Sequence, residues 1–396
     1  MVIRENFGCR TCGAKYTVRV GVGTDRHEMH SFDCLECGLP ISIITKSDPP
    51  KAWVVPDENA VMNDESQSGI IINLHPNFAF EREEVHQEYI FASLAYLTKI
   101  ADVIKKVPGN HQDAAFQFDM PNANFMWGIA KGVIILKRSG GQEKKIQKLI
   151  NDYERQRRKI FPDTHITDYK ELLYNFFDSL FYPKFEKLLA PSKKLLSEVK
   201  EKYPEQFQAL SKYHRDNLQQ ENINRYISIF ADYFKIRTDL NQMIVHSRLD
   251  DIDIQNKVVG SKHFDVVKLF YGQAFETLTS HFPILACINN ILSNRDFDQF
   301  QQMTLNKYIK DVEKAKMSNP FSDREELFAY AKYLDSTLRN GSHHASMWRE
   351  GEIIYYRSGG SGEKREMPYS MYLYLCNELI IAIAALFCLE LELNSL

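Results

Sequence analysis

Four cysteines near the N-terminus are the residues best suited to chemistry in this chain of 396 residues. They form two CxxCG motifs, which contribute Cys9, Cys12, Cys34 and Cys37. The two-residue spacing lets both thiolates of a pair reach one ion, and the following glycine permits the positive φ of a tight turn. We therefore expect a tetrahedral Zn²⁺ site. Because four thiolates leave no open coordination position, the zinc would be structural.

This pattern, over residues 1–45, resembles a zinc ribbon, and the resemblance implies a small β domain held together by the metal. Residues 16–20 and 41–44 have the composition of short strands. Two alternatives stay open at this point: the pairs could be redox-active, or His27 and His30 could replace a cysteine ligand. The ribbon could contact nucleic acid, a protein partner or its own chain.

A second polar group lies in the C-terminal third, at the end of an expected helix. Ser322 and Glu325 have the spacing of a capping box, an apolar pattern continues from there to Leu338, and a helix is expected over 322–339. Gly341 is expected to end this helix. The junction then holds four side chains able to bind or protonate a substrate: Arg339, Asn340, His343 and His344.

The pattern Arg339-Asn340-x-x-x-His344 resembles the R-x4–6-H motif of HEPN-domain ribonucleases, in which a polar residue, often Asn, follows the arginine. The helical context on both sides of the motif is also similar. This resemblance covers residues 262–396 and implies a helical bundle. Sites of this family are usually built by two protomers whose motifs face each other, so a homodimer is expected.

The resemblance implies His344 as the acid/base residue, Arg339 as the phosphate clamp, and Asn340 as the residue that holds the histidine or a phosphate oxygen. RNA cleavage at such a site proceeds by attack of the 2′-hydroxyl on the adjacent phosphate and needs no metal. A histidine can take the proton, and an arginine fork binds phosphate oxygens in pairs. His343 could share the histidine role. Alternatively, Arg339 interacts with the helix dipole, and both histidines are ordinary loop residues.

A basic stretch between residues 131 and 159 could bind a nucleic-acid backbone. It has ten Lys and Arg against three acidic residues, in a chain whose formal charge is −3. A solvated helix face explains such a run equally well. The residues expected to contact nucleic acid are Lys144, Lys145, Lys148, Arg155, Arg157 and Arg158.

The order of elements predicts a mainly α protein with a β zinc ribbon. We expect a ribbon over 1–45, a proline-containing linker over 46–69, a mainly helical region over 70–250 and the HEPN-like domain over 262–396. Within the last, a hairpin (352–357 and 363–367) precedes a helix over 370–391. Five tyrosines are expected to pack this hairpin on that helix: Tyr355, Tyr356, Tyr369, Tyr372 and Tyr374.

Composition limits the class of protein further. Hydrophobic residues make up 44% and aromatic residues 12% of the chain, which excludes bulk disorder. The N-terminus does not have the pattern of a signal peptide. The longest apolar run, 379–389, has eleven residues, against roughly 20 for a membrane-spanning helix. Seven cysteines, four of them in metal-type pairs, are typical of a reducing cytoplasm.

The sequence therefore predicts a cytoplasmic, metal-independent endoribonuclease that acts on RNA. Proteins of this build often serve as toxins or antiviral defence effectors, so a regulatory protein partner is also expected. The alternative is a non-catalytic zinc-ribbon adaptor or nucleic-acid-binding subunit, whose HEPN-like bundle dimerises or binds a partner. A metal-dependent nuclease would instead need acidic residues that converge near Asp250.

Overall fold

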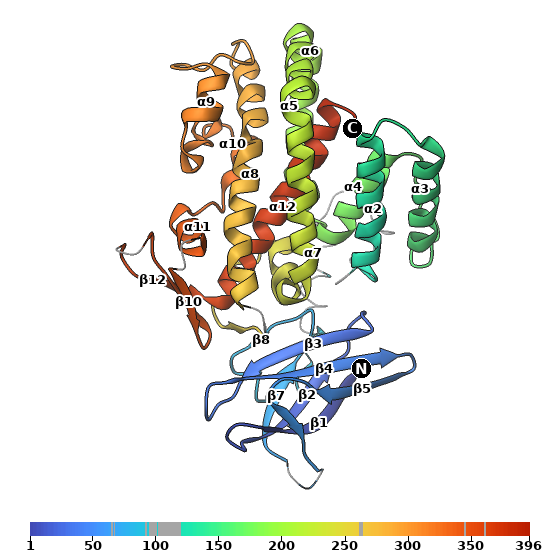
Figure 1. Ribbon diagram of the computed structural model, residues 1–396, viewed down its shortest axis with the longest axis vertical. Coiled ribbons are helices and arrows are strands. Elements are labelled where there is room, and N and C mark those ends of the chain that lie inside the picture. Colours follow the sequence, from blue (N-terminus) through green and yellow to red (C-terminus); the bar gives the residue numbers. More distant parts are fainter. Residues whose placement is uncertain are drawn as a thin grey trace. The chain divides into compact units, whose positions relative to one another are not determined.

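The chain folds into two compact units, which alternate along the sequence in this computed structural model (Figure 1). The structure describes residues 1–64, 66, 68–91, 93–94, 101, 120–260, 264–343, 346–359 and 362–396. Unit 1 comprises Met1–Asn122, Lys235–Leu269 and Gly341–Asn377, and unit 2 comprises Ala123–Phe234, Phe270–Asn340 and Glu378–Leu396. Three long helices contribute residues to both units: α7 (Gln219–Leu249), α8 (Phe264–Leu292) and α12 (Tyr369–Leu393).

Two sheets form the N-terminal part of unit 1. The first has the order β6-β1-β2-β7, with β7 parallel to β2 and the other pairs antiparallel. Its strands are β1 (Val2–Cys9), β2 (Lys15–Gly21), β6 (Ala60–Met62) and β7 (Ile70–Leu74). The second is antiparallel and contains β3 (His27–Asp33), β4 (Pro40–Asp48) and β5 (Lys51–Pro56).

Side chains from both sheets form one apolar core. This shared core explains why the β region continues past residue 45, the expected end of the ribbon. Strand β5 pairs with β4, and β6 pairs with β1, although both lie in the expected linker, 46–69. The β region also extends beyond residue 70, through β7 and the short pair of β8 (Phe80–Glu81) with β9 (Lys257–Val258). The core residues include Phe7, Tyr16, Val18, Val20, Ile41, Ile43, Val54, Ile72 and Leu74.

Unit 2 is helical in its described residues. Its first helices are α2 (Ala123–Arg138), α3 (Glu143–Arg158), α4 (Tyr169–Phe181), α5 (Lys184–Lys202), α6 (Pro204–Tyr213) and the π-helical turn η2 (His214–Leu218). Asp168 caps α4 by accepting a hydrogen bond from the backbone N–H of Glu171, at 2.9 Å. Aromatic rings from α2, α4 and α7 fill the centre, where the Trp127 ring stacks on Phe234 at a centroid distance of 5.4 Å.

The helix expected over 322–339 is broken into short pieces. These are α10 (Glu325–Phe328), η5 (Ala329–Ala331) and α11 (Ser336–His343). They are preceded by α9 (Leu305–Asp311), η3 (Lys314–Lys316) and η4 (Asn319–Phe321). Ser322 donates to the Asn319 carbonyl at 3.0 Å and makes no capping box. Asp335 instead caps α11, because its carboxylate accepts from the backbone N–H of Thr337 at 2.7 Å. Gly341 does not end α11, which continues to His343.

A three-stranded antiparallel sheet follows α11. It contains β10 (Met347–Glu350), β11 (Ile353–Tyr356) and β12 (Arg365–Pro368). The β11–β12 hairpin confirms the sequence prediction, whereas β10 was not expected. Four of the five tyrosines are buried, but Tyr355 is partly exposed, because strand alternation turns it to the other face of this sheet.

Helix α12 extends slightly beyond its predicted bounds, 370–391. Its 25 residues have a mean hydropathy of 2.0 over the most apolar window, so by length and composition alone it could span a membrane. Within the structure, 94% of that window is buried by protein, as in the core helix of a globular protein.

Candidate metal centre and candidate active site

Each CxxCG motif forms a tight turn at the end of a strand. The N–H of Gly13 donates to the Cys9 carbonyl at 2.9 Å, and the N–H of Gly38 donates to the Cys34 carbonyl at 2.8 Å. Both glycines have positive φ, 80° and 72°, which a side chain would strain. The two turns therefore have matching backbones, and each presents one buried and one exposed thiol.

The two turns bring the four sulfur atoms together. All four Sγ atoms lie within 4.8 Å of one another, with 3.5 Å between Cys12 and Cys34 and 3.8 Å between Cys9 and Cys37. Four ligands at a Zn–S distance of about 2.3 Å would place the sulfurs roughly 3.8 Å apart in a tetrahedron. None of the four is in a disulfide. This cluster is thus able to hold one metal ion.

The two histidines considered as substitute ligands lie outside this cluster. His27 is exposed on β3, and His30 is buried on the same strand. Burial lowers the pKa of His30 to about 4, and neither of its ring nitrogens has a hydrogen-bond partner among the described residues. His30 is therefore a neutral core residue.

Two residues that the sequence did not single out contact the sulfurs. The Tyr16 hydroxyl accepts from the Leu35 backbone N–H at 2.9 Å, which leaves its own proton to donate to Cys34 Sγ at 3.1 Å. Asn59 Nδ2 donates to Cys9 Sγ at 3.5 Å. Burial raises the pKa of Cys34, but the hydrogen bonds from Tyr16 and from backbone N–H groups outweigh burial and lower it to about 6. These donors therefore stabilise the thiolate form, as outer-shell groups of a metal site do.

Arg339, the expected phosphate clamp, lies on α11 and already has a partner. Its Nε donates to Glu276 Oε1 at 2.7 Å, a second guanidinium nitrogen forms an ion pair with the same carboxylate, and Nη1 donates to Asn340 Oδ1 at 2.7 Å. The side chains of Arg339 and Glu276 are 30% and 32% exposed. The guanidinium is thus held in one orientation, with its charge compensated at the protein surface.

The structure describes one of the two expected histidines, His343. His343 is exposed at the end of α11, four residues after Arg339, a spacing that places two residues on one face of a helix. His344 lies outside the described residues.

The backbone at Gly341 lies close to β11, which leaves no room for a larger side chain: a Cβ there would lie 3.1 Å from the Tyr356 Cβ. The end of α11 therefore lies directly against β11.

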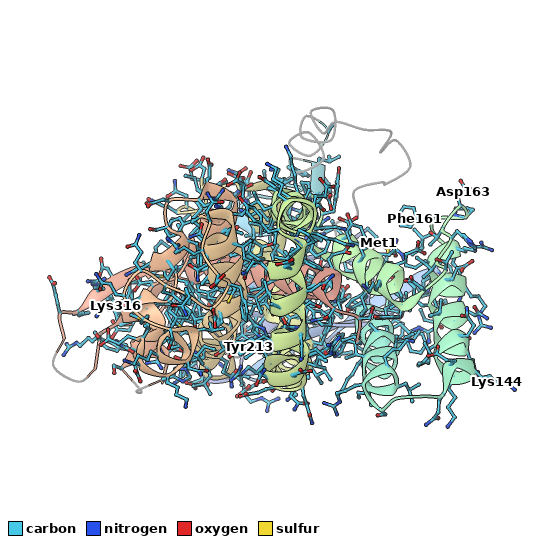
Figure 2. All side chains as sticks on the ribbon, turned by 90° about the horizontal axis from the view of Figure 1, so that it is seen from above. Met1, Lys144, Phe161, Asp163, Tyr213 and Lys316 are labelled. Atoms are coloured by element: carbon cyan, nitrogen blue, oxygen red, sulfur yellow. The ribbon has the colours of Figure 1, made fainter. Side chains whose placement is uncertain are left out.

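Only part of the expected basic surface is exposed. Lys144, Lys145 and Lys148 are exposed on α3, and Figure 2 shows Lys144 directed away from the helices. Arg155 and Arg158 form ion pairs within this region, with Asp152 at 2.8 Å and Glu154 at 2.7 Å.

Arg157 does not lie on the exposed basic surface where the sequence predicts it, because its side chain is buried in α3. It donates to Ser179 at 2.8 Å and lies over the Phe161 ring at 4.7 Å. Burial also lowers the pKa of Arg157.

The acidic cluster near Asp250 does not converge on a metal site in the described part of the chain. Asp251 instead pairs with the buried ring of His246, with 3.0 Å between Oδ2 and Nδ1.

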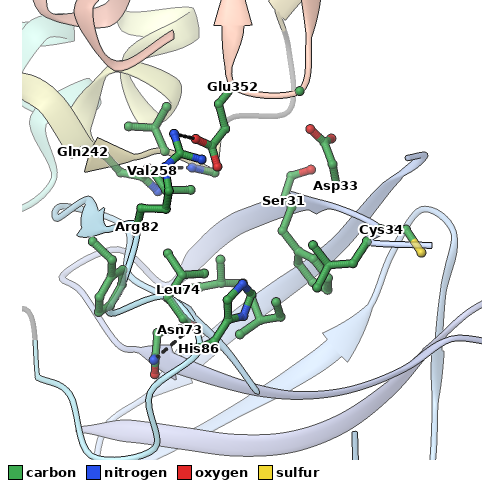
Figure 3. A pocket seen from close by; sticks show the side chains of 18 of the residues that line it. Ser31, Asp33, Cys34, Asn73, Leu74, Arg82, His86, Gln242, Val258 and Glu352 are labelled. Atoms are coloured by element: carbon green, nitrogen blue, oxygen red, sulfur yellow. Dashed lines mark hydrogen bonds and ion pairs between the residues drawn. The ribbon is translucent and has the colours of Figure 1, made fainter. Parts of the chain in front are cut away.

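A cavity of about 630 Å³ lies in unit 1, beside the second cysteine turn (Figure 3). Its lining includes Cys34, Leu35 and the ion pair of Arg82 with Glu352. A second ion pair, between Asp33 and Arg349 at 2.8 Å, also lines the cavity. Within each of these two pairs the charges compensate each other.

No protein-family model, curated protein or solved structure matches this chain. The molecule is therefore defined by its own features. It is a mainly helical protein with N-terminal β sheets, and these sheets carry a four-cysteine cluster that is able to hold a metal ion. The resemblance to HEPN-domain ribonucleases stays a prediction.

Proposed function

We propose that Cys9, Cys12, Cys34 and Cys37 bind one Zn²⁺ ion that stabilises the N-terminal sheets. The supporting observation is the set of four sulfur ligands in two matched turns, a soft donor set that suits Zn²⁺ and has no open position for a substrate. Metal analysis of the purified protein should give one zinc per chain, and Cys37→Ser should lower this content. Glu36→Gln, in the same exposed turn, is the control and should leave it unchanged. Zinc content unaffected by Cys37→Ser would refute the assignment.

We propose further that the protein is an endoribonuclease whose chemistry uses Arg339, Asn340 and a histidine of the same segment. The observation that carries this proposal is the partly exposed Arg339 guanidinium, which Glu276 and Asn340 hold in a fixed orientation on the helix that carries His343. A guanidinium has five N–H donors, and the described contacts engage three of them. Two donors then remain for phosphate oxygens.

In this mechanism the histidine takes the proton of the RNA 2′-hydroxyl, whose oxygen attacks the adjacent phosphorus. The bond from phosphorus to the 5′-oxygen breaks, the 5′-oxygen takes up a proton, and a 2′,3′-cyclic phosphate is formed. Arg339 compensates the negative charge that develops on the phosphate oxygens. The family resemblance favours His344 as the base, and the helical spacing from Arg339 favours His343, so each must be tested separately.

The test is cleavage of tRNA and single-stranded RNA without added divalent metal. Magnesium is left out rather than chelated, because a strong chelator could also remove a structural zinc ion. Arg339→Ala should lose between about 100-fold and 10,000-fold in rate. The same loss is expected in either His343→Ala or His344→Ala, whichever removes the base. His165→Ala and Arg215→Ala, which change an exposed histidine and an exposed arginine elsewhere, should cleave normally. Equal rates in all variants would refute the proposal. Size-exclusion chromatography with light scattering tests the expected homodimer.

A second candidate function is a non-catalytic adaptor, and the Arg339–Glu276 pair is the observation that favours it. A guanidinium whose charge is compensated by a carboxylate is suited to a purely structural role, which here is to hold α11 on α8. Glu276→Gln distinguishes the two functions. If Arg339 is a phosphate clamp, removing the competing charge should lower KM for RNA and leave kcat within a few fold. If the protein is an adaptor, no variant cleaves RNA, and this substitution changes stability by less than about 1 kcal/mol, because the pair is partly solvent-exposed.

A further inference from the structure

The outward face of the β10–β11–β12 sheet combines partly exposed aromatic rings with cations. Strand alternation turns Met347, Ile354 and Tyr356 into the protein, where all three are buried. The opposite face carries Trp348, Tyr355, Arg357 and Lys364, which we call the Trp348 platform. Trp348 and Tyr355 are direct cross-strand partners and are both partly exposed.

The side chains of the platform lie one over another. The rings of Trp348 and Tyr355 stack with 5.6 Å between centroids and 28° between planes. Lys364 Nζ lies 3.7 Å from the Tyr355 centroid, and the Arg357 guanidinium carbon lies 5.9 Å from the Trp348 centroid. Lys364 is exposed, and a lysine side chain has four rotatable bonds, so its ammonium can leave the ring when another group stacks there. The face thus offers ring surface to a flat partner and cations to an anionic one.

The platform begins where the candidate catalytic helix ends. A Cβ at Gly341 would lie 3.1 Å from the Tyr356 Cβ and 3.3 Å from the Arg357 carbonyl oxygen, so the last turn of α11 contacts the end of β11. His343 is two residues beyond this contact, and Arg357 belongs to the platform itself. Strand β10 starts only four residues after His343.

We propose that the Trp348 platform binds single-stranded RNA, with bases stacked on Trp348 and Tyr355 and phosphates contacted by Arg357 and Lys364. This inference deepens the proposed endoribonuclease function, on which it rests, by naming the substrate class and its binding surface. Unpaired bases are required, because only they can leave their own stack and lie on an aromatic ring. Stacking of one base on such a ring contributes a factor of about 5 to 150 in affinity.

Charge supports the same occupant but contributes less than stacking. Glu350 and Glu366 lie on the same face, and Glu350 accepts the indole N–H of Trp348 at 2.9 Å. Arg357 and Lys364, if both face phosphates, contribute about −1.4 to the slope of log K against log salt. A protein partner that recognises only the positive charges would lack the dependence on the rings.

The experiment measures fluorescence anisotropy of a labelled, single-stranded 2′-O-methyl oligonucleotide of uridines with the full-length protein. This probe has no 2′-hydroxyl to attack the phosphate, so binding is separated from cleavage. Trp348→Thr and Tyr355→Thr keep a residue suited to strands and should each weaken binding by about 10-fold or more. Trp53→Thr, at a tryptophan that is 44% exposed on β5, is the matched control and should bind within about twofold of the wild type. Unchanged binding in both platform variants would overturn the proposal.

A second measurement covers the case in which the threonine variants fold poorly. Stacked bases should quench the tryptophan fluorescence of the wild-type protein, and Trp348→Phe, which keeps a ring in the strand, should remove most of this quenching. Quenching that persists in Trp348→Phe would overturn the proposal. A duplex of the same length should compete at least 10-fold less well than the single strand, and equal competition would also overturn it.

The outcomes distinguish this inference from the proposed nuclease activity. Arg215→Ala, at an exposed arginine that belongs to neither proposed site, should bind the 2′-O-methyl probe like the wild type. If platform variants lose binding while no protein cleaves RNA, the platform is supported and the nuclease is refuted. If Arg339→Ala abolishes cleavage while platform variants bind normally, the nuclease is supported and the platform is refuted.

Discussion

Glu390, on α12, is a buried carboxylate that accepts four hydrogen bonds, and its replacement gives a sharp test of the fold of unit 2. Oε1 accepts from His281 Nδ1 and from the Tyr226 hydroxyl, both at 2.7 Å. Oε2 accepts from His214 Nε2 and from Asn222 Nδ2, both at 2.9 Å. Burial alone would raise the pKa of Glu390, but the interactions with His281 and His214 outweigh it and hold the pKa well below its usual range. The carboxylate is therefore charged in the folded protein.

We predict that Glu390→Gln destabilises the protein strongly, although the two side chains have nearly the same shape. A glutamine has one acceptor oxygen, and its amide nitrogen donates, so two of the four donors would face another donor. At about 1.5–3 kcal/mol for each hydrogen bond to a charged group, the loss is about 3–6 kcal/mol. This agrees with the cost of about 3–5 kcal/mol for breaking a buried ion pair.

The assay is urea unfolding at pH 7, followed by circular dichroism at 222 nm. Glu392→Gln is the control, because Glu392 is two residues further along α12, 42% exposed, and paired with Lys193 at the surface. Its loss should cost less than about 1 kcal/mol. If Glu390→Gln is no less stable than Glu392→Gln, the hydrogen-bond argument is wrong.

The same carboxylate predicts a pH dependence. Because folding lowers the pKa of Glu390, its contribution to stability is fully present above the pKa of an unfolded glutamate, about 4.3, and is lost as pH falls towards the folded pKa. The stability difference between the wild type and Glu390→Gln should therefore shrink below about pH 4. A difference that grows as the pH falls through this range would contradict the assignment of a charged carboxylate.

Three further predictions concern the metal centre, the basic surface and the strand packing. Tyr16→Phe should weaken zinc binding about 10-fold in competition with a chromophoric chelator, and an unchanged affinity would show that its hydrogen bond to Cys34 is unimportant. Replacing Lys144, Lys145 and Lys148 together by Gln should reduce the salt slope of RNA binding by about 2, and an unchanged slope would remove this surface from the interface. Gly69→Ala should destabilise the protein in urea by several kcal/mol, at the upper end of single substitutions, because its Cβ would lie 1.9 Å from the Lys15 carbonyl oxygen. Gly128→Ala, where a Cβ meets nothing within 4 Å, should instead stabilise it by about 0.5–1 kcal/mol; the reverse order would refute the packing argument.

Features that depend on a few neighbouring residues could be predicted from the sequence. Each CxxCG turn is determined by the spacing of its two cysteines and by a following glycine with positive φ. The structure brings the four cysteines together as expected. The β11–β12 hairpin likewise follows from alternating residues around a glycine-rich turn. Where β5 and β6 form, the sequence predicts a linker, because the pairing of these short strands with β4 and β1 is decided by the shared core of the two sheets.

Two other differences between the predicted and the observed structure have different physical causes. Arg157 was counted with the basic surface, although it continues the buried stripe of α3 formed by Ile146, Ile150 and Tyr153. Helical periodicity was the signal that could have found it. The partners of Glu390 had no such signal, since His214 and Glu390 are 176 positions apart and meet only through tertiary packing. The same holds for Arg339 and Glu276, which are 63 positions apart.

The pairing of Arg339 with Glu276 also constrains how an RNA substrate would be held. A compensated guanidinium attracts phosphate weakly in the ground state, so most of the binding free energy has to come from other residues. The stacked rings of the Trp348 platform are a surface suited to supply it. In the proposed nuclease, Arg339 acts mainly where the phosphate gains charge, in the transition state. On this argument, changes to the platform raise KM, whereas loss of Arg339 lowers kcat.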